Sequence, residues 1–343
     1  MHIINHVLVG CTALGALALL AQPALAEPTI DLVKKRGQLV CGANGQLPGF
    51  SFLNAVKEWE GLDVDLCRAI AAAVLGDATK VKFVPLTAQQ RFPALAAGEV
   101  DVLVRNTTVT LQRDAGLGVQ FAAINYFDGQ AFVVPAKLNI RELASLRSST
   151  ICYTKGTTHE ANMLNWFRVR ALSVTPVGFD TDDAMYDAFL ASRCVGATAD
   201  ATALASSLVR RGKAADYFML PEVISKEPLG PFVRRDDNAW LDVVRWSHYA
   251  MLEAEERGIN RTGVDEIRRS SLDPEVKIFL GVTPGNGKAL GLSEAWAYNI
   301  IKQVGNYSES FERNLGTRSP LNLARRINAL WNQGGQMYPP PLR

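Results

Sequence analysis

One short loop, Arg105 to Arg113, gathers guanidinium, amide and hydroxyl groups directly after the strand-like run 100–104. In open α/β sheets, ligands bind beyond the carboxyl ends of the strands. A planar guanidinium such as that of Arg113 can form paired hydrogen bonds with a carboxylate, and Asn106 and Thr108 can complete its shell. The loop therefore indicates a carboxylate site, with a polar surface turn as the alternative.

Two further loops carry complementary chemistry. Gly156-Thr157-Thr158 precedes an expected helix, whose free backbone N–H groups and positive dipole end favour an anion. Asp200 ends another strand-like run and is suited to an ammonium group. A carboxylate and an ammonium group together describe an α-amino acid. Each loop also has a simpler interpretation as a helix cap, but their joint occurrence favours a ligand site.

Alternating strands and helices position these loops. The order strand–helix–strand–helix–strand occurs twice, which implies parallel pairing with right-handed crossovers. The sequence thus predicts an α/β protein with two similar halves. The first half is predicted to hold strands at 39–42, 81–86 and 100–104 and helices at 61–74 and 89–97; the second, strands at 149–153, 174–179 and 194–200 and helices at 159–171 and 181–192, the last capped by Thr181.

Two extended stretches, 125–135 and 224–233, are predicted to cross between the halves. The remainder, from Asp237 to Arg343, is expected to be mostly helical. The segments 240–255 and 322–331 show the apolar spacing of helices.

The amino terminus is typical of a secretory signal peptide. Residues 1–26 contain no Asp, Glu, Lys or Arg, include the apolar run 7–20, and end in Ala24-Leu-Ala26. Cys11 lies in a lipoprotein-like box, but too little apolar chain precedes it for lipidation. No later run reaches the ~18 uninterrupted apolar residues of a membrane-spanning helix. The predicted location of the mature chain is the periplasm.

Four cysteines remain after the signal peptide, which indicates disulfides in an oxidising compartment. Four cysteines allow three pairings. We favour the pairing Cys41–Cys67 and Cys152–Cys194, because it places one bridge within each half of the chain. None of the four lies in a C-x-x-C pattern and histidines are sparse, so no metal site is expected.

Composition narrows the function further. The net charge is +2, with both signs interspersed, so a nucleic-acid partner is not expected. The mature chain is long enough for two lobes with separate cores. No cofactor is expected, and the chain is expected to be a monomer.

Longer motifs make a resemblance clear. The chain resembles the periplasmic amino-acid-binding proteins of ABC importers, and more narrowly their general L-amino-acid-binding branch. The similarity covers nearly all of the mature chain. The motifs that carry it are Gly61-Leu-Asp-Val-Asp-Leu-Cys67, Gly98-Glu-Val-Asp-Val-Leu-Val-Arg-Asn-Thr-Thr108, Ser225-Lys-Glu-Pro-Leu-Gly-Pro231, Val304-Gly-Asn-Tyr307, Ala329-Leu-Trp-Asn332 and Tyr338-Pro-Pro-Pro-Leu-Arg343.

The resemblance implies a type II periplasmic binding fold, with two Rossmann-like lobes, two hinge strands and a helical carboxyl-terminal extension. Lobe 1 would comprise residues 27–130 and 230–343, and lobe 2 residues 131–229. It also implies ligand roles. Arg113 would bind the ligand carboxylate, Asp200 the α-ammonium, and Asn106, Thr108, Thr157 and Thr158 would form further hydrogen bonds.

Departures from relatives bear on specificity. Leu47 stands where relatives that prefer basic ligands place an aromatic residue, which disfavours strict Lys or Arg binding. Arg91 occupies a position that acidic-ligand relatives use for a side-chain carboxylate; another acid of the protein could hold it instead. We therefore expect broad L-amino-acid binding, with delivery to a membrane permease.

Other residues are interpreted as structural. Asp63 and Asp65 are expected to serve the start of a helix, and His159 is interpreted as an exposed residue without function. Two other functions stay open. One is a periplasmic arogenate or prephenate dehydratase on the same fold, which would need a general acid in the cleft. The other is a sensory module that presents its ligand to a membrane receptor.

Overall fold

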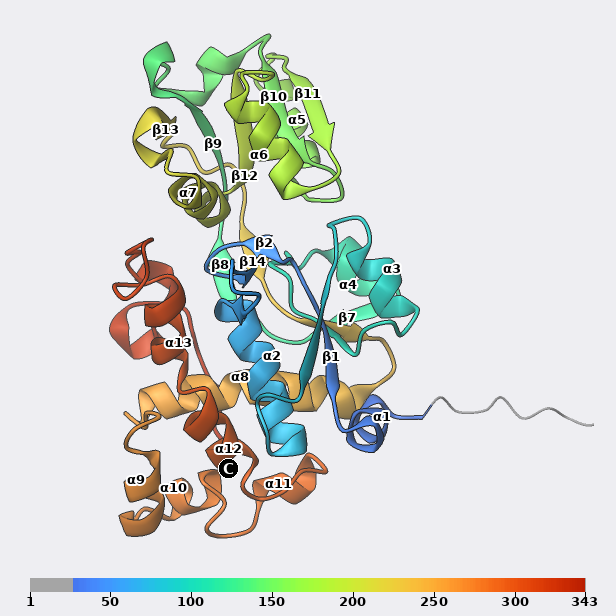
Figure 1. The fold of residues 1–343 in the computed structure, drawn as a ribbon, viewed down its shortest axis with the longest axis vertical. Helices are drawn as coiled ribbons and strands as arrows, with labels where there is room; N and C mark the ends of the chain where they lie inside the picture. The colour runs from blue at the N-terminus through green and yellow to red at the C-terminus, as the bar shows by residue number, and fades with distance from the viewer. Residues whose placement is uncertain (1–26, 343) are drawn as a thin grey trace, which may run out of the picture.

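A computed structural model describes residues 27–342 in two α/β lobes, drawn one above the other in Figure 1. The expected signal peptide lies outside the described residues. Each lobe is built on a five-stranded mixed sheet. Between 27 and 342, no helix has the length and apolarity needed to cross a membrane.

The first sheet has the strand order β5-β1-β6-β15-β7. Its β1 pairs in parallel with β5 and β6, as the alternating sequence pattern predicts, while β15 joins β6 and β7 antiparallel. The elements of this region are α1 (Thr29–Arg36), β1 (Leu39–Ala43), α2 (Leu62–Leu75), β5 (Val81–Pro85), α3 (Arg91–Ala96), β6 (Val102–Leu103), α4 (Leu111–Gly116), β7 (Val119–Phe121) and β15 (Phe232–Arg234); a small separate sheet comprises β2 (Gln46–Leu47), β3 (Ser51–Leu53) and β4 (Trp59–Glu60).

The second sheet repeats the arrangement with the order β11-β10-β12-β9-β13. Strand β10 pairs in parallel with β11 and β12, and β9 runs antiparallel to β12. Thr181 caps α6 as expected, because its hydroxyl accepts from the Ala184 N–H. The elements are β9 (Gln130–Pro135), β10 (Thr150–Thr154), α5 (His159–Arg168), β11 (Thr175–Phe179), α6 (Asp182–Leu190), β12 (Gly196–Asp200), α7 (Ala201–Arg210) and β13 (Tyr217–Met219).

A two-stranded ribbon connects the lobes. Strand β8 (Tyr126–Asp128) pairs antiparallel with β14 (Glu227–Leu229), and Asp128 lies opposite Glu227. Figure 1 shows both strands between the two lobes. Gly129 and Gly230 follow these strands directly. A Cβ atom at Gly230 would lie 2.0 Å from the Ala123 carbonyl oxygen, so only glycine fits this crossing. The two crossing segments expected from the sequence are therefore present.

Helices of the carboxyl-terminal region pack against the first lobe, at the bottom of Figure 1. Helix α8 buries the indole of Trp240, whose Nε1–H donates to the Asp101 carbonyl oxygen at 2.9 Å. Helices α8 and α12 both contact α2. The helices are α8 (Asn238–Glu256), α9 (Val264–Ser270), α10 (Pro274–Phe279), α11 (Asn286–Ala289), α12 (Trp296–Gln303) and α13 (Tyr307–Asn314).

The prediction of a helix at 322–331 is wrong. That segment holds only two 3₁₀ turns, Arg326–Asn328 and Trp331–Gln333. Asn322 and Arg326 have φ values of 46° and 47°, in a region that an α-helix of L-residues cannot use. Leu330 is nevertheless fully buried, so its apolar character reflects packing of an irregular chain.

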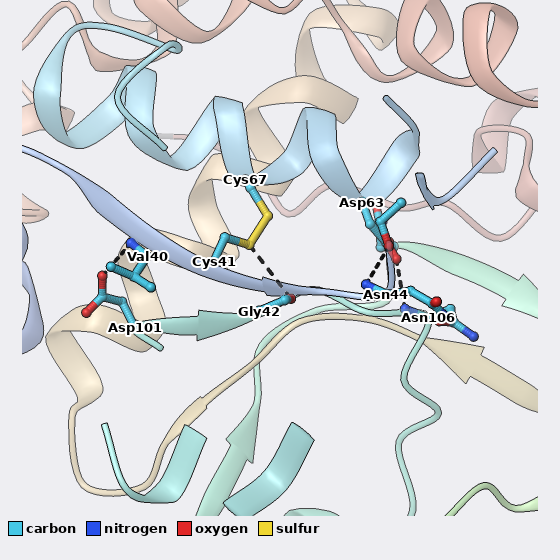
Figure 2. Close-up of a disulfide and its surroundings, with 10 residues drawn as sticks. Val40, Cys41, Gly42, Asn44, Asp63, Cys67, Asp101 and Asn106 are labelled. Carbon is cyan, nitrogen blue, oxygen red and sulfur yellow. Dashed lines mark hydrogen bonds between the residues drawn. A yellow bond between two sulfur atoms is a disulfide. The ribbon is translucent and has the colours of Figure 1, made fainter. Parts of the chain in front are cut away.

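Both lobes contain a disulfide, with the pairing that the sequence favours. Cys41 on β1 is bonded to Cys67 on α2, which fastens the helix to its sheet (Figure 2). Cys152 on β10 is bonded to Cys194, which lies two residues before the neighbouring strand β12.

Removal of the second disulfide is expected to destabilise the protein without affecting its ligand contacts. The bridge spans 42 residues. Loss of such a cross-link increases the conformational entropy of the unfolded chain, which lowers the unfolding free energy by about 3–4 kcal/mol. Urea denaturation of the Cys152→Ala/Cys194→Ala double variant measures this. An unfolding free energy equal to that of the unmodified protein would show that the bridge does not form in solution.

Candidate ligand-binding site

The loop after β6 is held by a buried carboxylate of α2. Asp63 accepts a hydrogen bond from the Asn106 backbone N–H at 2.8 Å and another from the Asn125 side-chain amide at 3.1 Å. Figure 2 shows Asp63, in the first turn of α2, facing Asn106. Asn106 has φ 31°, a value that a non-glycine residue keeps only when its surroundings hold it. Burial raises the pKa of Asp63 to about 6, against the opposing effect of these hydrogen bonds.

Three arginines of the first lobe are buried at its interface with the second. Arg91 is 2% exposed, Arg105 4% and Arg113 9%. Burial lowers the pKa of all three guanidinium groups, and the charges of Arg113 and Arg105 lower that of Arg91 further. The Nε–H of Arg91 has no hydrogen-bond partner among the described residues. A cluster of this kind favours an anionic ligand group.

Gly156 brings the second lobe against these arginines. Its carbonyl oxygen accepts from Arg91 Nη2 at 3.1 Å and from Arg113 Nη2 at 3.4 Å. Its φ is +78°, and a Cβ atom there would lie 2.9 Å from the Gln89 backbone nitrogen. The two lobes are therefore in direct backbone contact at this point.

Glu227, on the hinge strand β14, lies at the centre of a network that joins both lobes. Its carboxylate accepts from Thr108 Oγ1 at 2.5 Å in the first lobe and from Thr158 Oγ1 at 2.9 Å in the second. It also accepts from Asn162 Nδ2 and Ser225 Oγ. Glu227 is 1% exposed. Two of the three threonines predicted as ligand contacts, Thr108 and Thr158, thus lie together and donate to an acid that the site prediction omitted.

Asp200 occupies the N-cap position of α7 but forms no capping hydrogen bond with its side chain. Its Oδ1 lies 3.0 Å from His159 Nε2. His159 is 6% exposed, so its interpretation as an exposed residue without function is wrong about its location. The helix α5 begins at His159 and turns that side chain inward, which sequence spacing alone does not reveal.

A small cavity of about 100 Å³, lined mostly by polar residues together with Pro85 and Leu86, lies beside Arg105 between the lobes. Asp182 of α6 lines this cavity from the second lobe and contacts the first. Its carboxylate accepts from Asn44 Nδ2 at 2.9 Å and lies 3.8 Å from Arg105 Nη2. Burial acts to raise the pKa of Asp182, but Arg105 and the hydrogen bonds to the carboxylate outweigh it, so this pKa is lowered. The cavity is lined by Asn44, Gln46, Pro85, Leu86, Thr87, Gln90, Arg105, Thr181 and Asp182.

The remaining predicted site residues have different surroundings. Leu47 is 2% exposed and belongs to the hydrophobic core, whereas its neighbour Gln46 lines the cavity. Thr157 donates to the Thr154 carbonyl oxygen, which stabilises the turn before α5. The Asn106 side chain accepts from Asn44 Nδ2.

The interpretation of Asp63 and Asp65 as helix-start residues describes their position only. Both lie in the first turn of α2, but the Asp65 carboxylate accepts from Ser310, Arg313 and Asn314 on the distant helix α13. One acid therefore holds the site loop, and the other holds the carboxyl-terminal helices.

These two acids form a matched pair for mutation. Asp63→Ala is expected to weaken ligand binding and to lower stability by about 1–3 kcal/mol, because two buried donors lose their acceptor. Asp65→Ala, two residues away, is expected to lower stability and leave ligand affinity unchanged. Chemical denaturation and calorimetric titration of both variants test this. Equal ligand affinities in the two variants would show that Asp63 does not position the loop.

Within residues 27–342, no group of three or more His, Cys, Asp and Glu side chains is arranged to hold a metal ion. The arrangement instead offers buried cations on one lobe and carboxylates on the other and on the hinge. Two α/β lobes, a two-stranded hinge and a polar interface with charges of both signs define a solute-binding protein of the type II periplasmic binding class.

The chain belongs to the bacterial extracellular solute-binding proteins, family 3, whose family model matches residues 39–259. It is 48% identical over 328 residues to the glutamate/glutamine/aspartate/asparagine-binding protein BztA of Rhodobacter capsulatus, covering 96% of this chain and 97% of that protein. It is 45% identical over 334 residues to the general L-amino acid-binding periplasmic protein AapJ of Rhizobium johnstonii, covering 96% and 98%.

A solved structure agrees with these matches. A periplasmic binding protein of an ABC transporter from Brucella ovis, with glutathione bound, is 46% identical and superposes with a TM-score of 0.89, covering 92% of this chain and 100% of that one. The matched family consists of solute-binding proteins, so the dehydratase alternative finds no support.

Proposed function

We propose that this protein binds L-amino acids between its two lobes and delivers them to the membrane permease of an ABC importer. The observation that carries the proposal is the distribution of charge. Arg113 and Arg91 come from the first lobe and Asp200 from the second; burial lowers the pKa of both arginines, and the charge of Asp200 partly opposes this lowering. An α-amino acid carries its carboxylate and ammonium groups on one carbon, and can therefore contact both sets together.

The polar cavity supports a preference for acidic and amide side chains. Arg105 and the amides of Gln46 and Gln90 offer donors there, and Asp182 offers acceptors. Arg91 retains an unpaired N–H. Both Glu and Gln side chains can be satisfied by such a set. The name of the relative BztA describes glutamate, glutamine, aspartate and asparagine as ligands, and that of AapJ describes L-amino acids in general.

The proposal also covers the processing, location, oligomeric state and lobe boundaries of the protein. The mature protein would begin at Glu27, after cleavage of a signal peptide, and act in the periplasm as a monomer. The division into lobe 1, residues 27–130 and 230–343, and lobe 2, residues 131–229, belongs to the same proposal, and the placement of the two sheets supports it.

A thermal-shift panel of the twenty L-amino acids and their D-forms tests this function, with glutathione as an additional probe. A ligand at about 100 times its dissociation constant should add about 2.7 kcal/mol of stability. Stabilisation by several L-amino acids, greatest for Glu, Gln, Asp and Asn, is the expected result. Stabilisation by one compound alone would contradict broad specificity, and stabilisation by glutathione alone would indicate a peptide-binding protein.

A further inference from the structure

The buried hinge acid Glu227 combines two unusual features. Four hydrogen-bond donors surround its carboxylate, and all of them belong to neutral side chains: Thr108, Thr158, Asn162 and Ser225. No ion pair among residues 27–342 includes Glu227. A buried carboxylate without a contacting cation carries a desolvation cost that a nearby positive charge would reduce.

Glu227 also fixes the direction of two hydroxyl groups. A threonine hydroxyl has one hydrogen and two lone pairs. Thr108 and Thr158 each donate that hydrogen to Oε2 of Glu227. Their oxygens can then only accept further hydrogen bonds. A carboxylate needs donors, whereas an ammonium group offers three donors and no acceptor.

We propose that Glu227 is a specificity-determining residue for the α-ammonium group of the ligand. It acts by turning the oxygens of Thr108 and Thr158 into acceptors and by supplying, at the hinge, a negative charge that forms no ion pair within residues 27–342. This inference rests on the proposed amino-acid function and assigns to that site a residue from outside the predicted ligand loops. Because its partners come from both lobes, the acceptor set is complete only when the lobes meet.

The location of Glu227 supports this role. It lies opposite Asp128 in the hinge ladder. Burial lowers the pKa of Arg113, and the charges of Glu227 and Asp200 partly oppose this lowering. The hinge acid and the second-lobe acid therefore both lie near the guanidinium group expected to hold the ligand carboxylate. On an α-amino acid the ammonium group is adjacent to that carboxylate, within reach of the same acids.

The test compares ligands that differ only in the α-substituent. L-Glutamate is paired with 2-hydroxyglutarate, and L-alanine with L-lactate, and each is titrated calorimetrically into wild-type protein and Glu227→Gln. We expect the variant to lose about tenfold or more in affinity for the amino acids. Affinity for the hydroxy acids should stay the same or rise, so discrimination between the members of each pair shrinks.

Glu253→Gln is the matched control. Glu253 is a buried acid of α8 that pairs with Arg257, away from the lobe interface; its replacement should leave both affinities unchanged. Thermal melts establish folding. If Glu227→Gln does not fold, Thr158→Val removes one of the oriented oxygens and should show the same selective loss.

The outcomes are distinct. An equal loss of affinity for both members of a pair would show that Glu227 only holds the lobes in place, and would overturn the inference. No loss of affinity for either member would also overturn it. If wild-type protein binds no amino acid in the panel, the proposed function itself fails.

Discussion

Replacement of Arg113 by alanine is expected to abolish amino-acid binding while leaving the fold intact. Charge-assisted hydrogen bonds to a carboxylate contribute about 1.5–3 kcal/mol each, so loss of a paired contact should weaken binding by at least about 100-fold. In the fold, Arg113 itself donates to the Thr108 carbonyl oxygen and the Gly156 carbonyl oxygen. Neither contact belongs to the hydrophobic core, so cooperative unfolding should persist.

Two further variants sharpen this prediction. Arg113→Lys keeps the positive charge but loses the planar fork of donors, so binding should remain strongly weakened. Arg141→Ala removes an exposed arginine of the second lobe, which lies over the Phe218 ring, and should bind ligand as the wild type does. Calorimetric titration with L-glutamate measures all three. Wild-type affinity in Arg113→Ala would refute the assignment of the carboxylate site.

Features with a local cause could be predicted from the sequence. The apolar stripe of 61–74 predicts a helix, and α2 spans Leu62–Leu75. Twofold alternation of strands and helices predicts parallel sheets, and both lobes show them. One cysteine pair in each half favours the disulfide pairing that the structure shows. In each case the information lies within a few tens of residues.

Features that depend on distant contacts were not predicted. Glu227 lies 119 positions from Thr108 and 69 from Thr158, and no local pattern connects them. An acid within an otherwise apolar hinge run, Glu-Pro-Leu-Gly-Pro, was the available signal. No such local signal marks His159, because its burial depends on the position of Asp200, 41 residues away.

Apolar spacing misled at 322–331 for a related reason. Leu330 is fully buried, Leu323 is partly buried and Ile327 is 44% exposed, so the apolar residues of this segment do not share one buried helical face. Positive φ values at Asn322 and Arg326 show that the backbone there follows an irregular path. Apolar spacing therefore predicts neither the helix nor the burial of each apolar residue in this segment.

The charged groups explain why ligand binding and lobe contact should be coupled. A ligand shifts a conformational equilibrium only through differential contacts with the two states. Arg113 belongs to the first lobe, Asp200 to the second and Glu227 to the hinge, so one α-amino acid can contact all three only when the lobes approach. Gly129 and Gly230, next to the hinge strands, are positioned to absorb the rotation.

Gly156→Ala is expected to oppose this approach directly. The added Cβ would lie 2.9 Å from the Gln89 backbone nitrogen and 3.0 Å from the Ala88 carbonyl carbon, both in the first lobe. Backbone atoms cannot move aside as a flexible side chain can, so the lobes must separate slightly. Separation also lengthens the hydrogen bonds from Arg91 and Arg113 to the Gly156 carbonyl oxygen. Ligand affinity should fall by at least about 100-fold, because a misplacement of about 1 Å in such a site is costly.

Gly212→Ala provides the matched control for backbone strain. Gly212 also lies in the second lobe with a positive φ, +64°, but a Cβ atom there meets nothing within 4 Å. Both variants carry the penalty of about 1 kcal/mol for alanine in this region of φ, and only Gly156→Ala adds a collision between the lobes. Small-angle scattering with and without saturating L-glutamate, together with calorimetry, separates the two effects. Gly212→Ala should bind ligand and show the ligand-dependent radius of gyration of the wild type, whereas Gly156→Ala should keep a larger radius in the presence of ligand. Wild-type affinity and compaction in Gly156→Ala would show that the contact between Gly156 and the Ala88–Gln89 backbone is not required for ligand capture.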